Sequence, residues 1–134
     1  MSFNWNDYIK IADELAQKHT LKEASCRSAI SRAYYGAFCT ARNYLQTKEG
    51  VKEFGENAHN SVRDIFVSSN DQNRREIGNK LNRLRLSRNK ADYDNTYTVS
   101  SSSLLKETEN ALKNAKQIVD SIEKLIGGRS NLKK

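Results

Sequence analysis

The spacing of the apolar residues restricts this chain to a helical fold. Along most of the sequence the apolar positions recur at intervals of three and four, which places them on one face of an α-helix. No long stretch alternates apolar and polar residues as a half-buried strand does, and the chain contains no proline to interrupt a helix. We therefore predict an all-α fold, an up-and-down bundle of four to five helices.

Capping and turn residues divide the chain into five predicted helices. We expect them to begin near Asn6, Thr20, Asn57, Gln72 and Ser103. Gly50 closes the second helix, the fourth ends near Asn89, and Gly127 and Gly128 end the last, with residues 92–102 as a loop. The length of 134 residues predicts a single domain, residues 1–128, followed by a disordered basic tail at 129–134.

The positive charge of the chain is concentrated in one segment. The formal net charge is +7, and residues 72–90 carry seven basic side chains against one acidic side chain, Glu76. Such a concentration is typical of a surface that binds phosphate groups. The alternative is that these side chains only keep the outer faces of a helix in water, and the charge pattern leaves both interpretations open.

Arg88 occupies a position where an apolar residue is expected. It continues, at helical spacing, a row of three apolar residues that begins at Ile77. A guanidinium in that row must point into the core, a cleft or a subunit interface, and a buried cation needs a partner. Asp92 or Asp94 could supply an internal ion pair. A ligand phosphate is the other candidate, because the planar guanidinium fits that anion.

The remaining composition argues against several classes of protein. Cys26 and Cys39 fall on one predicted helix, about 20 Å apart, which is too far for a disulfide and typical of a reducing compartment. Together with His19 and His59 they lack the spacing of a zinc site, so we predict no metal and no cofactor. No apolar run reaches the roughly 18 residues of a membrane span, and no secretion signal is visible. These observations predict a cytoplasmic protein.

Two stretches resemble motifs of a known family. SRAYYGAF at 31–38, followed by Ala41 and Arg42, is similar to the second-helix motif of the HEPN domain family. LRLSRNKADYD at 84–94 resembles the end of the fourth helix in the small stand-alone prokaryotic branch of that family, in which a histidine often occupies the position of His59. The resemblance covers residues 7–126. It implies a helical bundle that forms a homodimer in a toxin–antitoxin or phage-defence module, often beside a nucleotidyltransferase.

The resemblance also implies candidate catalytic residues. Catalytic members of the family resemble metal-independent ribonucleases that use an arginine, a polar residue and, a few residues later, a histidine. Arg88 and Asn89 match the first half of that motif, but Tyr93 stands where the histidine is expected, and no histidine follows His59. Histidine exchanges protons near neutral pH, whereas tyrosine has a pKa near 10 and is a poor base. The candidate catalytic residues are therefore Arg88, His59 and Tyr93.

We predict that the protein binds RNA or a nucleotide phosphate in a basic cleft and lacks the usual catalytic histidine. The candidate phosphate-binding residues are Arg74, Arg85, Arg88, Asn89 and Lys90. The alternatives are a metal-independent endoribonuclease toxin with an altered active site and a non-catalytic protein-interaction subunit in which Arg88 closes an internal salt bridge. The resemblance further implies a nucleotidyltransferase partner that modifies a tyrosine, for which Tyr93 and Tyr97 are the candidates.

Overall fold

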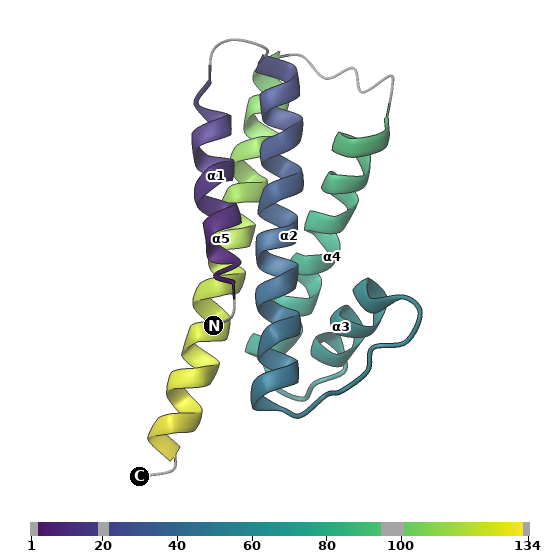
Figure 1. Cartoon of the computed structure of the whole chain (residues 1–134), viewed down its shortest axis with the longest axis vertical. Coiled ribbons are helices and arrows are strands. Elements are labelled where there is room, and N and C mark those ends of the chain that lie inside the picture. The colour runs from purple at the N-terminus through teal and green to yellow at the C-terminus, as the bar shows by residue number, and fades with distance from the viewer. Residues whose placement is uncertain (1–2, 19–21, 95–100, 133–134) are drawn as a thin grey trace.

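Five helices make up the part of the chain that the computed structural model describes, residues 3–18, 22–94 and 101–132. They are α1 (Asn6–Ala16), α2 (Lys22–Lys48), α3 (Ala58–Val67), α4 (Gln72–Tyr93) and α5 (Ser101–Leu132). The long helices alternate in direction, and the short α3 is inserted between α2 and α4 (Figure 1). Within those ranges there is no strand, so the prediction of an all-α bundle of four to five helices is confirmed.

Two of the predicted helix starts are confirmed by side-chain caps. The side chain of Asn57 accepts a hydrogen bond from the backbone N–H of Asn60 at 3.0 Å, and that of Asp71 accepts one from Arg74 at 3.3 Å. Each cap satisfies a backbone N–H that the first turn of a helix leaves without a partner. The capping residue predicted for the second helix, Thr20, lies outside the described residues.

Two predicted boundaries were wrong. Helix α4 continues through Asp92 to Tyr93, because Arg27 of α2 donates hydrogen bonds to the carbonyls of Ala91 and Asp94, at 3.3 and 2.9 Å, and so supports its last turn. Helix α5 begins at Ser101 and passes the expected end at Gly127, reaching into the predicted tail. A glycine inside a helix costs only about 1 kcal/mol relative to alanine, which a helix this long tolerates.

Helix α2 is the centre of the bundle and packs against α1, α4 and α5, whereas α3 packs mainly against α4 (Figure 1). Its apolar face is fully buried around Ile30, Tyr34 and Leu45. Both cysteines lie on α2 and do not pair with each other, as the spacing predicted, and both are buried. This arrangement places one side of α2 opposite both α3 and the C-terminal half of α4, and the candidate site lies there.

Close contacts between helices depend on two glycines. A Cβ atom at Gly36 of α2 would lie 2.7 Å from a side-chain carbon of Ile9 in α1. A Cβ atom at Gly78 of α4 would lie 2.9 Å from the backbone nitrogen of Val67 at the end of α3. Glycine at these positions therefore lets α1 approach α2 and α3 approach α4 more closely than any other residue would allow.

Candidate phosphate-binding site

Arg88 is buried on the inner face of α4, as its place in the apolar row predicted. Its side chain is 8% exposed, and Nη1 lies 3.7 Å from Oδ2 of Asp92, one turn further along the helix. Nε is buried and has no hydrogen-bond partner among the described residues. A guanidinium carries five N–H donors, so one long ion pair leaves most of its hydrogen-bonding capacity unused.

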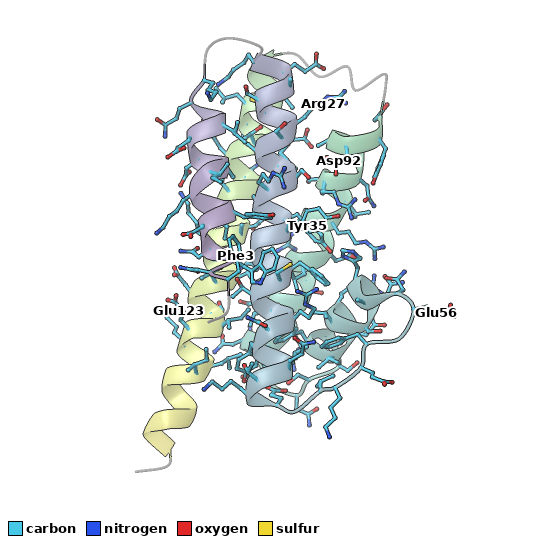
Figure 2. The ribbon with its side chains drawn as sticks, viewed as in Figure 1. Phe3, Arg27, Tyr35, Glu56, Asp92 and Glu123 are labelled. Carbon is cyan, nitrogen blue, oxygen red and sulfur yellow. The ribbon has the colours of Figure 1, made fainter. Side chains whose placement is uncertain are left out.

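Three tyrosine rings surround this guanidinium. The Cζ atom of Arg88 is 5.3 Å from the ring centroid of Tyr34, 5.2 Å from that of Tyr35 and 5.9 Å from that of Tyr93. Tyr34 is buried, Tyr35 is half-buried and Tyr93 is 74% exposed, so the rings lead from the core to the surface. Figure 2 shows Tyr35 on α2 and Asp92 on α4, where the two helices lie side by side. Cation–π contacts replace part of the lost hydration of the cation.

His59 lies on α3 next to the same rings. The Tyr34 hydroxyl is 2.5 Å from Nδ1 of His59, and the imidazole stacks on Phe38 with ring centroids 4.3 Å apart. The Tyr34 hydroxyl is buried and has no other partner in the described part of the chain, so Nδ1 is the one acceptor for its proton. The proton of a neutral imidazole then resides on Nε2, which makes no hydrogen bond to the described residues. His59 therefore offers a free N–H donor.

The surroundings of this pair hold both groups in their neutral forms. Burial lowers the pKa of His59 below its usual value, and the nearby guanidinium groups of Arg85, Arg88 and Arg42 lower it further. Burial also raises the pKa of Tyr34 above its usual value. Desolvation disfavours the charged form of each group, and neighbouring cations oppose a second positive charge on the imidazole. At neutral pH the site therefore carries its positive charge on arginines alone.

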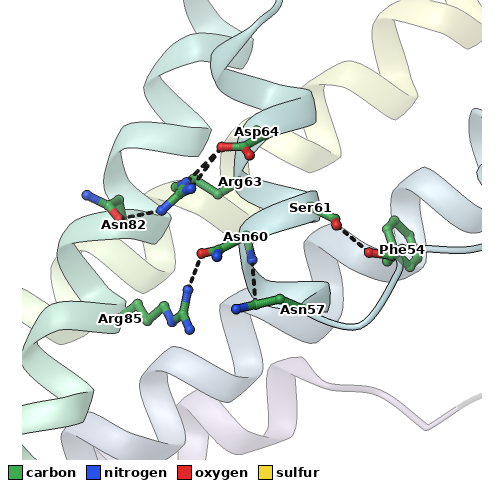
Figure 3. A network of polar contacts seen from close by, with 8 residues as sticks. All are labelled: Phe54, Asn57, Asn60, Ser61, Arg63, Asp64, Asn82 and Arg85. Carbon is green, nitrogen blue, oxygen red and sulfur yellow. Dashed lines mark hydrogen bonds and ion pairs between the residues drawn. The ribbon is translucent and has the colours of Figure 1, made fainter.

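Two further arginines lie around His59. Nη1 of Arg85 donates a hydrogen bond of 2.5 Å to the side-chain oxygen of Asn60, which belongs to a polar network between α3 and α4 (Figure 3). Arg42 lies over the ring of Phe38, with Cζ 5.7 Å from the centroid. In both, as in Arg88, Nε is buried and has no partner among the described residues. We call Arg42, Arg85 and Arg88 the arginine cluster.

The other predicted phosphate-binding residues lie outside this cluster. Asn89 and Lys90 follow Arg88 on α4 and are exposed to solvent. Arg74 lies fourteen residues before Arg88, about 21 Å away along the helix. It forms an ion pair with Glu49, with Nη2 3.1 Å from Oε1, and its Nε donates to Ser69 at 3.1 Å.

Of the two candidate modification residues, the structure describes Tyr93. Tyr93 is the last residue of α4 and its side chain is largely exposed. Tyr97 lies outside the described residues.

Sequence reasoning did not identify Arg42 and Tyr34 as site residues. Tyr34, Phe38 and Arg42 are spaced by four, which places them on one face of α2 and was a usable signal. Both rings are buried in the core, but the Tyr34 hydroxyl also binds His59. The sequence did not reveal that this face of α2 meets α3.

The arrangement is suited to an anion. Arg42, Arg85 and Arg88 each have an Nε–H without a partner among the described residues, and all three act electrostatically on the neutral imidazole of His59. A phosphate group can accept hydrogen bonds from several such donors. Within the described ranges, no cluster of three or more histidine, cysteine or acidic side chains is arranged to hold a metal ion. Among the described helices, none has the length and apolar character needed to cross a membrane.

Comparison with known proteins assigns the chain to a family. The model of the HEPN domain matches residues 6–125. No curated protein and no solved structure matches the chain. HEPN domains occur in ribonuclease toxins and in defence modules, and they commonly form dimers. Because the match covers most of the 134 residues and agrees with the five-helix bundle, the protein belongs to the HEPN domain family.

Proposed function

We propose that the protein binds a phosphate group of RNA or of a nucleotide at the arginine cluster. In this proposal it is a cytoplasmic, homodimeric component of a toxin–antitoxin or phage-defence module and lacks the usual catalytic histidine. The supporting observation is that the buried Nε atoms of Arg42, Arg85 and Arg88 have no hydrogen-bond partners in the described part of the chain. Burying such groups without partners costs free energy, and a bound anion supplies the missing acceptors.

The charge of α4 supports the same ligand. Seven of the basic side chains lie between Gln72 and Lys90, so a polyanion is attracted to the helix that carries Arg85 and Arg88. The free Nε2–H of His59 adds a neutral donor beside these cations. A neutral donor strengthens phosphate binding without increasing the repulsion among the positive charges.

The test compares two arginines of α4 by fluorescence anisotropy with a labelled single-stranded RNA oligonucleotide. Arg88→Met removes the buried guanidinium, whereas Arg83→Met removes the same charge from an exposed position on the same helix. We expect Arg88→Met to weaken binding about tenfold or more, since a hydrogen bond to a charged group contributes about 1.5–3 kcal/mol. Arg83→Met should weaken it only about twofold, through the long-range field.

The salt dependence of binding gives a second readout. The slope of log affinity against log salt concentration should become shallower in Arg88→Met, because a phosphate contact is lost. Equal losses in the two variants would indicate nonspecific attraction and contradict the proposal. An unchanged affinity combined with a large loss of stability in Arg88→Met would instead support the protein-interaction alternative, in which Arg88 only closes an internal salt bridge.

A metal-independent ribonuclease is the second candidate function. The observation that favours it is the neutral imidazole of His59 beside Arg88 and Arg85, because such a group can exchange a proton while a guanidinium stabilises charge on the phosphate. Acting as a base, however, requires an unprotonated Nε2, and the hydrogen bond from Tyr34 favours the opposite tautomer. This is why we rank binding above catalysis.

Incubation of the protein with total RNA in the presence of EDTA separates the two functions. The binding proposal expects intact RNA. Cleavage that is lost in His59→Gln, with RNA affinity retained, would establish the ribonuclease. A parallel assay of Tyr93→Phe tests whether the phenol takes part, since this variant removes only the hydroxyl.

Modification of Tyr93 by a nucleotidyltransferase partner is part of the same proposal. Its exposed side chain supports this role. Mass spectrometry of the protein co-expressed with the enzyme encoded by its genomic neighbour should then show a nucleotide adduct on the peptide that spans Ala91 to Thr98. An unmodified peptide contradicts the idea for both Tyr93 and Tyr97.

A further inference from the structure

We infer that Tyr93 stacks an unpaired nucleobase beside the phosphate held by the arginine cluster, so that the site selects single-stranded RNA. This inference rests on the proposed function and specifies the ligand of that site. The observation that carries it is the position of one exposed aromatic ring next to a buried, unsatisfied cation. Tyr93 is 74% exposed, and its ring centroid is 5.9 Å from Cζ of Arg88, whose whole residue is only 6% exposed.

The two groups match the two halves of a nucleotide. A guanidinium binds the phosphate, and an aromatic ring binds the flat face of a base, so one nucleotide can contact both at this separation. Proteins that recognise unpaired RNA commonly stack its bases on aromatic side chains. In a duplex the faces of the bases are already stacked on each other, so a duplex can use the arginines but not Tyr93.

The backbone that carries Tyr93 is held in place. Arg27 of α2 binds the carbonyls of Ala91 and Asp94, and the hydroxyl of Ser31 donates to Oδ2 of Asp92 at 3.2 Å. The end of α4 is therefore attached to α2 on both sides of Tyr93 while the ring itself stays exposed. A platform that is already positioned loses little conformational entropy when a base stacks on it.

Contact with a second copy of the chain is the competing role for Tyr93. Leu86 is 58% exposed and lies two helical turns before Tyr93 on the same face of α4, so the two side chains could share a protein interface. Leu86 provides the matched control, because its substitution removes exposed apolar surface from that face without removing a ring. The test therefore includes both variants and a measurement of oligomeric state.

The experiment measures the affinity of the full chain for three probes. They are a single-stranded RNA oligonucleotide, a strand of equal length built from abasic nucleotides, and an RNA duplex. We expect Tyr93→Ala to weaken binding of the base-containing single strand about tenfold, as expected when one stacked base loses its platform. The abasic strand and the duplex should bind this variant as they bind the wild type. Tyr93→Phe, which keeps the ring, and Leu86→Ala should retain the wild-type affinity for all three probes.

Failure of this inference is distinguishable from failure of the proposed function. If Arg88→Met weakens all three probes while Tyr93→Ala weakens none, phosphate binding stands and base stacking is overturned. If Arg88→Met weakens no probe, the proposed function fails, and the inference fails with it. If Tyr93→Ala weakens binding of the base-containing and abasic strands equally, Tyr93 has a structural role and the inference is overturned. A change in the oligomeric state, measured by size-exclusion chromatography with light scattering, would show an interface role and overturn it as well.

Discussion

Two arginines at opposite ends of α4 are both mostly buried, yet they are bound in different ways. Arg74, near the start of the helix, pairs with Glu49 through two nitrogens, donates through Nε to Ser69 and lies over the ring of Phe66. Arg88, near the end of the helix, has one ion pair of 3.7 Å and a buried Nε without a partner among the described residues.

The two guanidinium groups differ in how many of their donors the described part of the protein uses. Arg74 joins the end of α2 to the start of α4, and its partners use the donors that a ligand would need. Arg88 keeps unused donors in a place where water does not reach Nε. Burial alone therefore does not distinguish the two arginines, whereas the partners of their donors do.

The largest expected effect is on stability, at the Arg74 end. Replacing Glu49 by alanine leaves the partly buried Arg74 guanidinium without a counter-charge, and we expect a loss of about 2–3 kcal/mol, between the values for exposed and for fully buried pairs. Urea unfolding should show a loss of this size, while the folded variant should bind RNA no more weakly than the wild type does. The double variant Glu49→Leu with Arg74→Met should recover part of the loss. If Glu49→Ala costs less than about 1 kcal/mol, the contrast between the two arginines disappears.

Arg88→Met should have a much smaller effect on the free energy of unfolding. We expect a change below about 1.5 kcal/mol in either direction, because the substitution removes unpaired donors and leaves a flexible apolar side chain against the tyrosine rings. The same urea titration measures it, next to the Glu49→Ala variant. A loss as large as that of Glu49→Ala would make Arg88 a structural residue like Arg74.

Asp92→Asn tests how strongly Asp92 holds Arg88. Asp92 is partly exposed and the ion pair is long, so stability should change by less than about 1 kcal/mol. Asparagine can still accept the hydrogen bond from Ser31. RNA affinity should rise about two- to threefold, because the carboxylate no longer competes with phosphate. Asp120→Asn, an exposed charge on α5, is the control, and an equal gain there would mean that only the net charge matters.

The smallest expected effect is a dependence of the free energy of unfolding on pH, which comes from His59 beside Arg88. Burial, with Arg85 and Arg88, lowers the pKa of His59, so the unfolded chain binds more protons than the folded one just below the unfolded pKa of about 6.5. The contribution of His59 to stability is therefore complete above that pH and is lost as the pH falls through the folded pKa. Thermal unfolding between about pH 5 and 8 should show this decline.

His59→Gln should flatten that pH profile, and Glu49→Ala should leave its shape unchanged. A wild-type profile that stays flat, or one that falls with rising pH over this range, would show that the arginines do not affect the imidazole as described.

Much of the fold was predictable because helices are specified by neighbours in the sequence. The capping residues Asn57 and Asp71 lie within three residues of the groups they bind, and the inward position of Arg88 follows from the apolar residues one and two turns before it. The sequence left Asp92 and Asp94 as possible internal partners of Arg88. The structure pairs Arg88 with Asp92, which lies one helical turn further along α4.

The boundary errors and the unpredicted pairing of Arg74 with Glu49 have one physical cause. Arg74 was grouped with the phosphate-binding residues because its charge is close to theirs in the sequence, but its partner Glu49 is twenty-five residues away. Helix α4 extends beyond its predicted end because Arg27, more than sixty residues earlier in the sequence, donates hydrogen bonds to its last carbonyls. Contacts over such separations form only when the helices pack, and no local pattern encodes them.

The amino-acid sequence by itself determined the helices, the basic character of α4 and the burial of Arg88, since each depends on residue types and a spacing of three or four. Only the tertiary structure decided that His59 of α3 meets Tyr34 of α2, and that Arg42 and Arg85 join Arg88 around that pair. Which helix faces meet depends on the packing of the whole core. The hydrogen bonds that an arginine makes, and those it leaves unmade, are therefore set by residues distant in the chain.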